Sequence, residues 1–235
     1  MLSSDENYHR NVDPHRPGSR LRDVILGGQD GLGNVLGVLL GVAAATEDPR
    51  IVLAAGLAAT FAESVSMGAV AYTATQAERA LYESEVARER RHIEQVPQLE
   101  ADEVREIYRQ KGISGELLEQ VVAAITANKE VWVAVMMDEE LRLQPVPRGR
   151  ALGAALTVGL AALIGSLIPL LPFVFFSIRT SIVASLVVST LTLFAAGAYK
   201  ARSTVGHWLR SGAEMTAIGM ASAVIGYLIG RLFHQ

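Results

Sequence analysis

The sequence predicts an all-α integral membrane protein with five transmembrane helices and a cytoplasmic three-helix metal-binding domain. Three observations lead to this fold class. Half of the 235 residues are hydrophobic, and the mean hydropathy is positive at +0.29. Several apolar segments are long enough to cross a bilayer, which takes roughly 20 helical residues. The charged residues are segregated into one central segment rather than spread along the chain.

The first apolar segment, residues 24–45, contains an aspartate, Asp30, in its first half. A carboxylate in a membrane helix costs on the order of 3 kcal/mol on insertion scales, so it favours a functional role such as cation binding. Glycines recur every four residues and predict a groove that a second helix can approach closely; they are Gly33, Gly37 and Gly41. The alternative is a soluble core helix with one satisfied aspartate.

Residues 1–20 are polar and are expected to form a disordered tail, without the apolar core of a signal peptide. Arginines precede the first span, and the positive-inside rule then places the N-terminus in the cytoplasm. Residues 21–75 are expected to hold the first two spans. The chain has no cysteine, which excludes disulfides, thiolate metal sites and a thiol nucleophile.

The second span, residues 51–75, carries Glu63 and Met67. Residues four apart share a helix face, so the carboxylate and the thioether are expected to lie together. Opposite Asp30 they form a candidate site for a divalent metal, since oxygen ligands suit harder ions and sulfur suits softer ones. The alternative for Met67 is simple packing.

Residues 76–147 are charged, with an acidic excess, and predict a water-exposed helical domain. Proline and glycine punctuation divides it into three expected helices. The first continues the second span over 76–95, the second covers 100–111, and the third covers 114–143 with Ser114 as its cap.

One face of the first of these helices gathers acidic residues and an imidazole. At about 100° per residue a narrow stripe forms, made of Glu78, Glu85, Glu89 and His92. Glu89 and His92 also form a Glu-x-x-His pair, the pattern that supplies di-iron sites in helical bundles. The alternative is an ordinary solvated face.

The third of these helices carries Met136, Met137 and Glu140. Two adjacent methionines beside an acidic run are candidate metal ligands, and the alternative is a methionine-rich packing seam. Residues 148–235 hold the last three expected spans, over 151–171, 181–199 and 213–230. A basic loop between the last two agrees with a cytoplasmic location.

Several motifs in this order resemble the vacuolar iron transporter family, and the resemblance covers the chain from Leu21 onward. The matching motifs are Gly28-Gln-Asp-Gly31, Glu63-Ser-Val-Ser-Met-Gly68, Met136-Met137-x-x-Glu140, Pro169-Leu-Leu-Pro172 and Arg210-Ser-Gly-x-Glu-Met215.

The resemblance implies five membrane helices in a homodimer that exports Fe(II), and in some members Mn(II), from the cytoplasm in exchange for protons. The family's membrane ligands map onto Asp30 and Met67. Its cytoplasmic ligands map onto Glu78, Leu81, Glu89, His92, Met136 and Glu140. Two of these positions depart from the family pattern, because Leu81 and His92 stand where glutamates are common. His92 can still bind a metal, and Glu85 lies on the same face.

The sequence is therefore interpreted as a divalent-metal/proton antiporter rather than an enzyme. Fe(II) is the expected cargo, with Mn(II), Co(II) or Zn(II) as alternatives and protons as counter-ion. The expected partners are the lipid bilayer, a second copy of the chain and metal ions, but no nucleic acid. The expected location is a bacterial inner membrane, with the N-terminus and the helical domain in the cytoplasm.

Two other classes of protein remain as alternatives. A membrane-tethered ferritin-like di-iron oxidase or iron-storage protein uses Glu89-x-x-His92, but it needs a second such pair. A metal sensor or structural membrane protein leaves Asp30 and Glu63 without a role, against their insertion cost.

Overall fold

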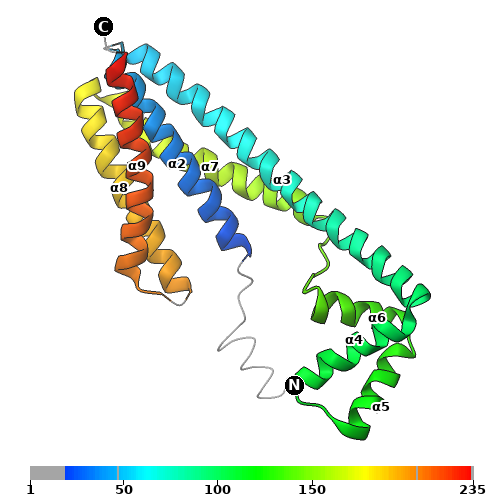
Figure 1. Ribbon diagram of the computed structural model, residues 1–235. Coiled ribbons are helices and arrows are strands. Elements are labelled where there is room, and N and C mark those ends of the chain that lie inside the picture. Colours follow the sequence, from blue (N-terminus) through cyan, green and yellow to red (C-terminus); the bar gives the residue numbers. More distant parts are fainter. Residues whose placement is uncertain (1–18, 47, 205, 234–235) are drawn as a thin grey trace, which may run out of the picture. The chain divides into compact units, whose positions relative to one another are not determined.

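The computed structural model describes residues 19–46, 48–204 and 206–233. Within these ranges the chain is helical and has no strand (Figure 1). Five of the described helices are long and apolar enough to cross a membrane: α2 (Ser19–Ala45), α3 (Pro49–Gln95), α7 (Arg150–Phe175), α8 (Ile178–Ser203) and α9 (Trp208–Leu232). The all-α class and the five predicted spans are therefore confirmed.

The chain divides into two compact units. The membrane unit comprises residues 1–72 and 152–235, and the polar unit comprises residues 73–151. Helix α3 runs without a break from one unit into the other, as expected for its apolar and charged halves. Residues 1–18 of the expected N-terminal tail lie outside the described residues.

Glycines let the helices of the membrane unit approach closely. Helix α2 packs against α9 and α8, and α8 packs against α9 (Figure 1). A Cβ atom on Gly226 would collide with the carbonyl oxygen of Gly37, and one on Gly230 with that of Gly41. The close approach predicted by the glycine stripe is found, and the partner is α9 of the same chain.

The opposite side of α2 lies equally close to α7. Gly27 contacts the backbone at Val158, and Gly31 contacts the backbone at Ala162. Helix α2 is thus held between two neighbours over the turn that carries Asp30.

Helix α7 continues through Pro169 and Pro172 to Phe175, so the sequence-based end near residue 171 was wrong. A proline inside a helix removes one donor and disturbs the preceding turn. Two serines of α8 bond to this part of α7: Ser185 Oγ donates to the Pro169 carbonyl at 2.5 Å, and Ser181 Oγ donates to that of Pro172 at 3.0 Å. These bonds attach α8 to the proline-containing end of α7.

The polar unit contains the second half of α3, followed by α4 (Pro97–Gln110), α5 (Gly115–Thr126), α6 (Lys129–Val135) and a π-helix, η2 (Met136–Glu140). The single helix expected over 114–143 was wrong. Asn128 interrupts it, because its side chain accepts hydrogen bonds from the N–H groups of Glu130 and Val131 and starts a new helix. Ser114 takes the cap position of α5 without a side-chain bond.

The polar unit has its own hydrophobic core. The buried members are Ile93, Val104, Leu118, Val122, Ile125, Trp132, Val133, Met136 and Met137. Since they come from α3, α4, α5, α6 and η2, this core fixes the helices that carry the charged residues described below.

Candidate metal sites

Two carboxyl groups from different helices meet in the membrane unit. The Glu63 side chain on α3 interacts with Asp30 and with Asn34, which both lie on α2. Asn34 follows Asp30 by one helical turn, so both reach the same point. Two interacting carboxyl groups can share one proton, and a divalent cation can take the place of that proton because metal ligands must be deprotonated.

A cavity of about 220 Å³ opens beside this pair, between α2 and α9. Asp30 and Asn34 line it together with Leu26, Gln29, Gly33, Ile218, Gly219 and Ser222. One water takes roughly 30 Å³ of liquid volume, so the cavity has room for a partly hydrated ion. The small residues on both helices leave this space open.

Met67, the third predicted membrane ligand, is half-buried and lies one turn beyond Glu63 on α3. Residues four apart share a helix face, so Met67 lies on the face of α3 that carries Glu63.

In the polar unit, Glu89 and His92 on α3 come together with Glu100 on α4. One ligand atom from each residue lies within 4.8 Å of the others. His92 Nδ1 is 3.3 Å from Glu100 Oε1. Imidazole nitrogen and carboxylate oxygen are both common metal ligands, so these atoms form a compact nitrogen–oxygen site.

The turn between α3 and α4 creates this arrangement. Helix α3 ends at Gln95 and α4 begins at Pro97, so Val96 alone connects them. A proline disfavours helical geometry in the residue before it, and Val96 accordingly leaves the helix at φ −135° and ψ 52°. Because the chain reverses within one residue, Glu100 faces back toward His92.

The two carboxyl groups of this cluster are buried without a full set of partners. Glu89 is 5% exposed and Glu100 is 2% exposed. The Oε2 atoms of both residues lack a hydrogen-bond partner. Buried polar groups are nearly always hydrogen-bonded, so these two oxygen atoms are available to a proton or a cation.

Burial and like charges shift the titration of these carboxyl groups. Burial, with the carboxylates of Glu103, Glu89 and Glu140, raises the pKa of Glu100 to about 7. Burial also raises the pKa of Glu89, which the nearby His92 partly opposes. Partial burial and the neighbours Glu103 and Glu89 raise the pKa of Glu140. The group is thus an acidic cluster that a cation would stabilise.

The remaining members of the predicted α3 stripe do not belong to the compact group of Glu89, His92 and Glu100. Glu78 is exposed, as is Leu81. Glu85 is paired with Arg88, at 2.9 Å between Oε2 and Nη1, so its charge already has a partner.

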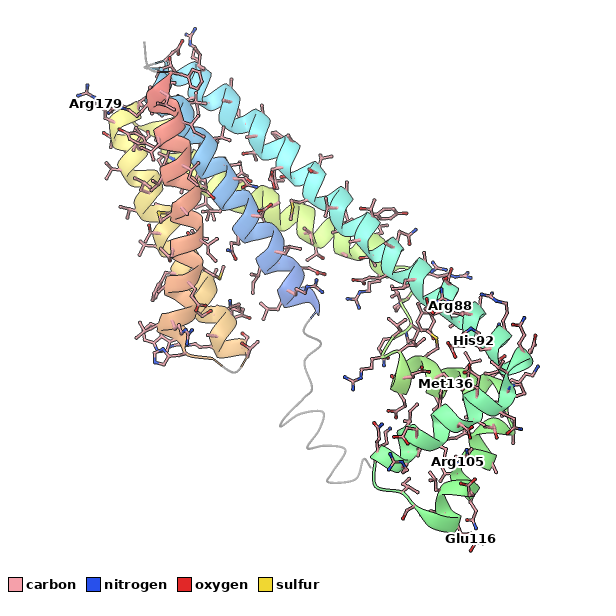
Figure 2. The ribbon with its side chains drawn as sticks, viewed as in Figure 1. Arg88, His92, Arg105, Glu116, Met136 and Arg179 are labelled. Carbon is pink, nitrogen blue, oxygen red and sulfur yellow. The ribbon has the colours of Figure 1, made fainter. Side chains whose placement is uncertain are left out.

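The methionines lie at the π-helix, which brings two adjacent side chains inward. The N–H of Leu141 donates to the Met136 carbonyl at 3.1 Å, a bond spanning five residues. Met136 is 0% and Met137 is 2% exposed, and both belong to the core of the polar unit. Figure 2 shows that His92 and Met136 come from α3 and η2 of this unit.

Sequence reasoning missed three residues near the two sites: Asn34, Glu100 and Glu103. Asn34 could have been found from its position four residues after Asp30. Glu100 shares a helix face with the buried Val104, and a glutamate on an apolar face is a signal for a buried acidic site.

Comparisons with known proteins give several matches. The family model of the VIT family matches residues 21–231. The chain is 37% identical to "Vacuolar iron transporter 2" of Oryza sativa subsp. japonica, covering 95% of this chain and 94% of the relative. It is 35% identical to "Vacuolar iron transporter 1" of Arabidopsis thaliana, covering 92% and 86%. "Protein CCC1" of Saccharomyces cerevisiae is 26% identical, over 96% and 71%.

These matches extend over nearly the whole chain and include both the membrane unit and the polar unit. The chain belongs to the VIT family.

Proposed function

We propose that this protein carries divalent iron across a membrane in exchange for protons, exporting it from the cytoplasm. The single observation that carries the proposal is the interaction of the Glu63 and Asp30 carboxyl groups between membrane helices. The iron cargo is supported by the relatives, whose names describe vacuolar iron transporters. Mn(II) is a second proposed cargo, since carboxylate ligands suit it as well.

The exchange follows from competition for one set of oxygens. With a shared proton, Glu63 and Asp30 are joined to each other. When a metal ion enters, the proton must leave, because a protonated carboxyl group is a poor ligand. Opening the pair to one side and then the other would move metal and proton in opposite directions.

Met67 is proposed as a soft ligand on the same path, one turn along α3 from Glu63. A thioether favours iron over harder ions. Replacing Met67 with Leu should keep transport and shift its preference toward Mn(II).

The polar unit is proposed to collect metal on the cytoplasmic side. Glu89, His92 and Glu140 are proposed ligands, supported by their shared acidic cluster. Met136 and Met137 are proposed soft contacts, and Glu78 and Glu85 are proposed to attract ions from the surface of α3.

The proposed setting is an inner bacterial membrane, with a second copy of the chain as partner. We propose that the N-terminus and the polar unit lie in the cytoplasm, since arginines precede α2 and basic residues, Lys200 and Arg202, end α8.

An oxidase or storage function of the ferritin type has weaker support. Such sites take a Glu-x-x-His motif from each of two helices. The polar unit is described throughout, and His92 is its single histidine. Oxygen consumption in the presence of Fe(II) tests this alternative directly. We expect the protein to consume oxygen no faster than Fe(II) does in detergent without protein.

The proposal is tested with purified protein in liposomes. Fe(II) entry is followed with an enclosed fluorescent chelator, and internal pH is followed with a second dye. We expect entry that accelerates under a pH gradient with protons inside, together with proton exit. Fe(II) entry whose rate does not depend on the pH gradient, without proton exit, would contradict antiport. Absence of Fe(II) entry would contradict transport.

A further inference from the structure

We propose that Glu100 of α4 is a metal ligand that determines ion preference. With Glu89 and His92 it would close a single-ion site of two carboxylates and one imidazole. This inference deepens the proposed function, because it concerns which ions the polar unit collects. Metal binding is measured without transport, however, so the two proposals can fail separately.

The geometry of the three residues fits one ion. Zn–O and Zn–N bonds are about 2.0–2.2 Å long, so neighbouring ligand atoms in a tetrahedral site are about 3.4 Å apart. The ligand atoms of Glu89, His92 and Glu100 lie within 4.8 Å of one another. The 3.3 Å between His92 Nδ1 and Glu100 Oε1 already matches the spacing around a shared ion.

Glu100 is better placed as a ligand than the exposed glutamates of α3. It is 2% exposed, and its Oε2 atom has no hydrogen-bond partner. Glu89 has the same property on the opposite helix. In the described chain no ion pair joins a lysine or arginine to either residue, so the cluster has no internal cation to balance it.

A second explanation of these facts is a carboxyl pair that shares one proton and binds no ion. In that case Glu100 serves only to pack α4 against α3. The two explanations differ in what a neutral side chain at position 100 does. A shared-proton pair tolerates glutamine, whereas a metal site loses a ligand.

The imidazole gives the site its ion preference. Imidazole suits Fe(II), Co(II) and Zn(II), whereas sites built of carboxylates suit Mn(II). His92 presents Nδ1 to the site, 3.3 Å from Glu100 Oε1. The mixed site should therefore discriminate against Mn(II) more strongly than an all-carboxylate cluster at the same position.

The first experiment compares Glu100→Gln with Glu103→Gln in full-length protein. Glu103 lies in the same acidic neighbourhood but outside the compact group of three. Glu63→Ala is present in both proteins so that the membrane pair does not contribute. Equilibrium dialysis against Co(II) measures the dissociation constant, and the visible absorption of bound Co(II) reports its ligands.

We expect Glu100→Gln to weaken Co(II) binding by at least about tenfold and to change the absorption spectrum. Glu103→Gln should weaken binding by less and leave the spectrum unchanged, because it removes only a nearby charge. Equal losses with an unchanged spectrum would show that Glu100 acts through charge alone and would overturn the proposal. Unaltered binding in Glu100→Gln would support the shared proton and overturn it too.

The second experiment measures ion preference in His92→Glu, with folding checked by Trp132 fluorescence. The ratio of Mn(II) to Co(II) dissociation constants should fall by about tenfold relative to His92, as expected for replacing imidazole by carboxylate. Arg91→Glu serves as a control that adds the same acidic side chain one residue away on an exposed position. A ratio that changes equally in both variants, or in neither, would overturn the role of the imidazole.

Discussion

Within the described chain, the two carboxyl clusters both lack a lysine or arginine partner, but their surroundings differ. Neither Glu63 nor Glu89 is paired with a lysine or arginine in the described chain. In the membrane unit the partners of Glu63 are another carboxyl group and an amide, beside a cavity of about 220 Å³. In the polar unit the partner is the exposed imidazole of His92, and the two carboxyl groups, Glu89 and Glu100, are buried.

The difference indicates two tasks. A carboxyl pair joined by a proton, next to open space, suits exchange of a proton for a metal ion. A buried site with an imidazole suits retention and discrimination, because the ligands are held in place by a packed core.

The largest effect is expected from Glu63→Ala. Metal entry into liposomes should fall to the background of empty liposomes, because the shared proton and a ligand are both lost. Glu214→Ala is the matched control, since Glu214 is also a carboxylate of the membrane unit but is exposed and paired with Arg210. Equal flux in the two variants would remove the distinction between the buried pair and a surface carboxylate.

The double change Glu89→Ala and Glu140→Ala should weaken Co(II) binding at least tenfold in the full-length protein. At saturating metal, flux should remain close to wild type, since the membrane pair is intact. Dialysis and flux measured on the same preparation check both statements. If saturating metal fails to restore flux, the polar unit does more than collect ions.

The helix contact beside Asp30 should be sensitive to one methyl group. In Gly226→Ala the new Cβ atom meets the Gly37 carbonyl, and we expect a loss on the order of 1–3 kcal/mol. Gly33→Ala is the control, because its nearest atoms would lie at 3.9 Å, an ordinary contact. Thermal unfolding in detergent should show a lower midpoint in Gly226→Ala alone.

The polar unit should lose stability as pH rises when no metal is present. The pKa of Glu100 is raised by burial to about 7 in the folded protein, from an ordinary value of 4.5. The folded state therefore binds more protons than the unfolded state between about pH 4.5 and 7, so stability falls with rising pH in this window.

Trp132 fluorescence, recorded in a Trp208→Phe background, measures this unfolding. We expect the midpoint to fall from pH 5 to pH 8 in the metal-free protein, with a smaller slope in Glu100→Gln. Added Co(II) should raise the midpoint at pH 8, because a ligand that binds only the folded state stabilises it. A midpoint that rises with pH in the metal-free protein would contradict the assignment of Glu100.

The smallest effect is expected from Asn128→Ala, which removes the cap of α6. The cost should be about 1 kcal/mol, as for other caps. The change should lower the midpoint of the polar unit and leave metal flux at saturating ion unaltered. Loss of flux would indicate that the two units are more tightly coupled than the present account assumes.

Much of the fold could be predicted from the sequence because membrane spans follow composition. The apolar runs indicated the five long helices, and the charge of Asp30 and Glu63 identified the membrane pair. Each of these signals is local: it depends on residues within one helix.

The parts that were missed depend on contacts between helices. Glu100 belongs to the cluster because Val96 reverses the chain within one residue, and the direction of such a turn is not a property of the helical pattern. Asn128 interrupts a sequence whose apolar spacing continues. Its side chain caps α6 and starts a new helix, although the spacing of apolar residues predicted a single one. The π-helix at Met136 changes the helical repeat itself, which a 100° pattern does not represent.

The most direct test of the central claim is simultaneous metal and proton flux in Asp30→Asn. Asparagine keeps the size and hydrogen bonding of Asp30 but removes its ionisable group. The account predicts that Fe(II) flux and the coupled proton flux both fall to background, while Co(II) binding by the polar unit stays at the wild-type level. Wild-type flux of both ions in this variant would contradict the account and leave Asp30 as a packing residue between α7 and α9.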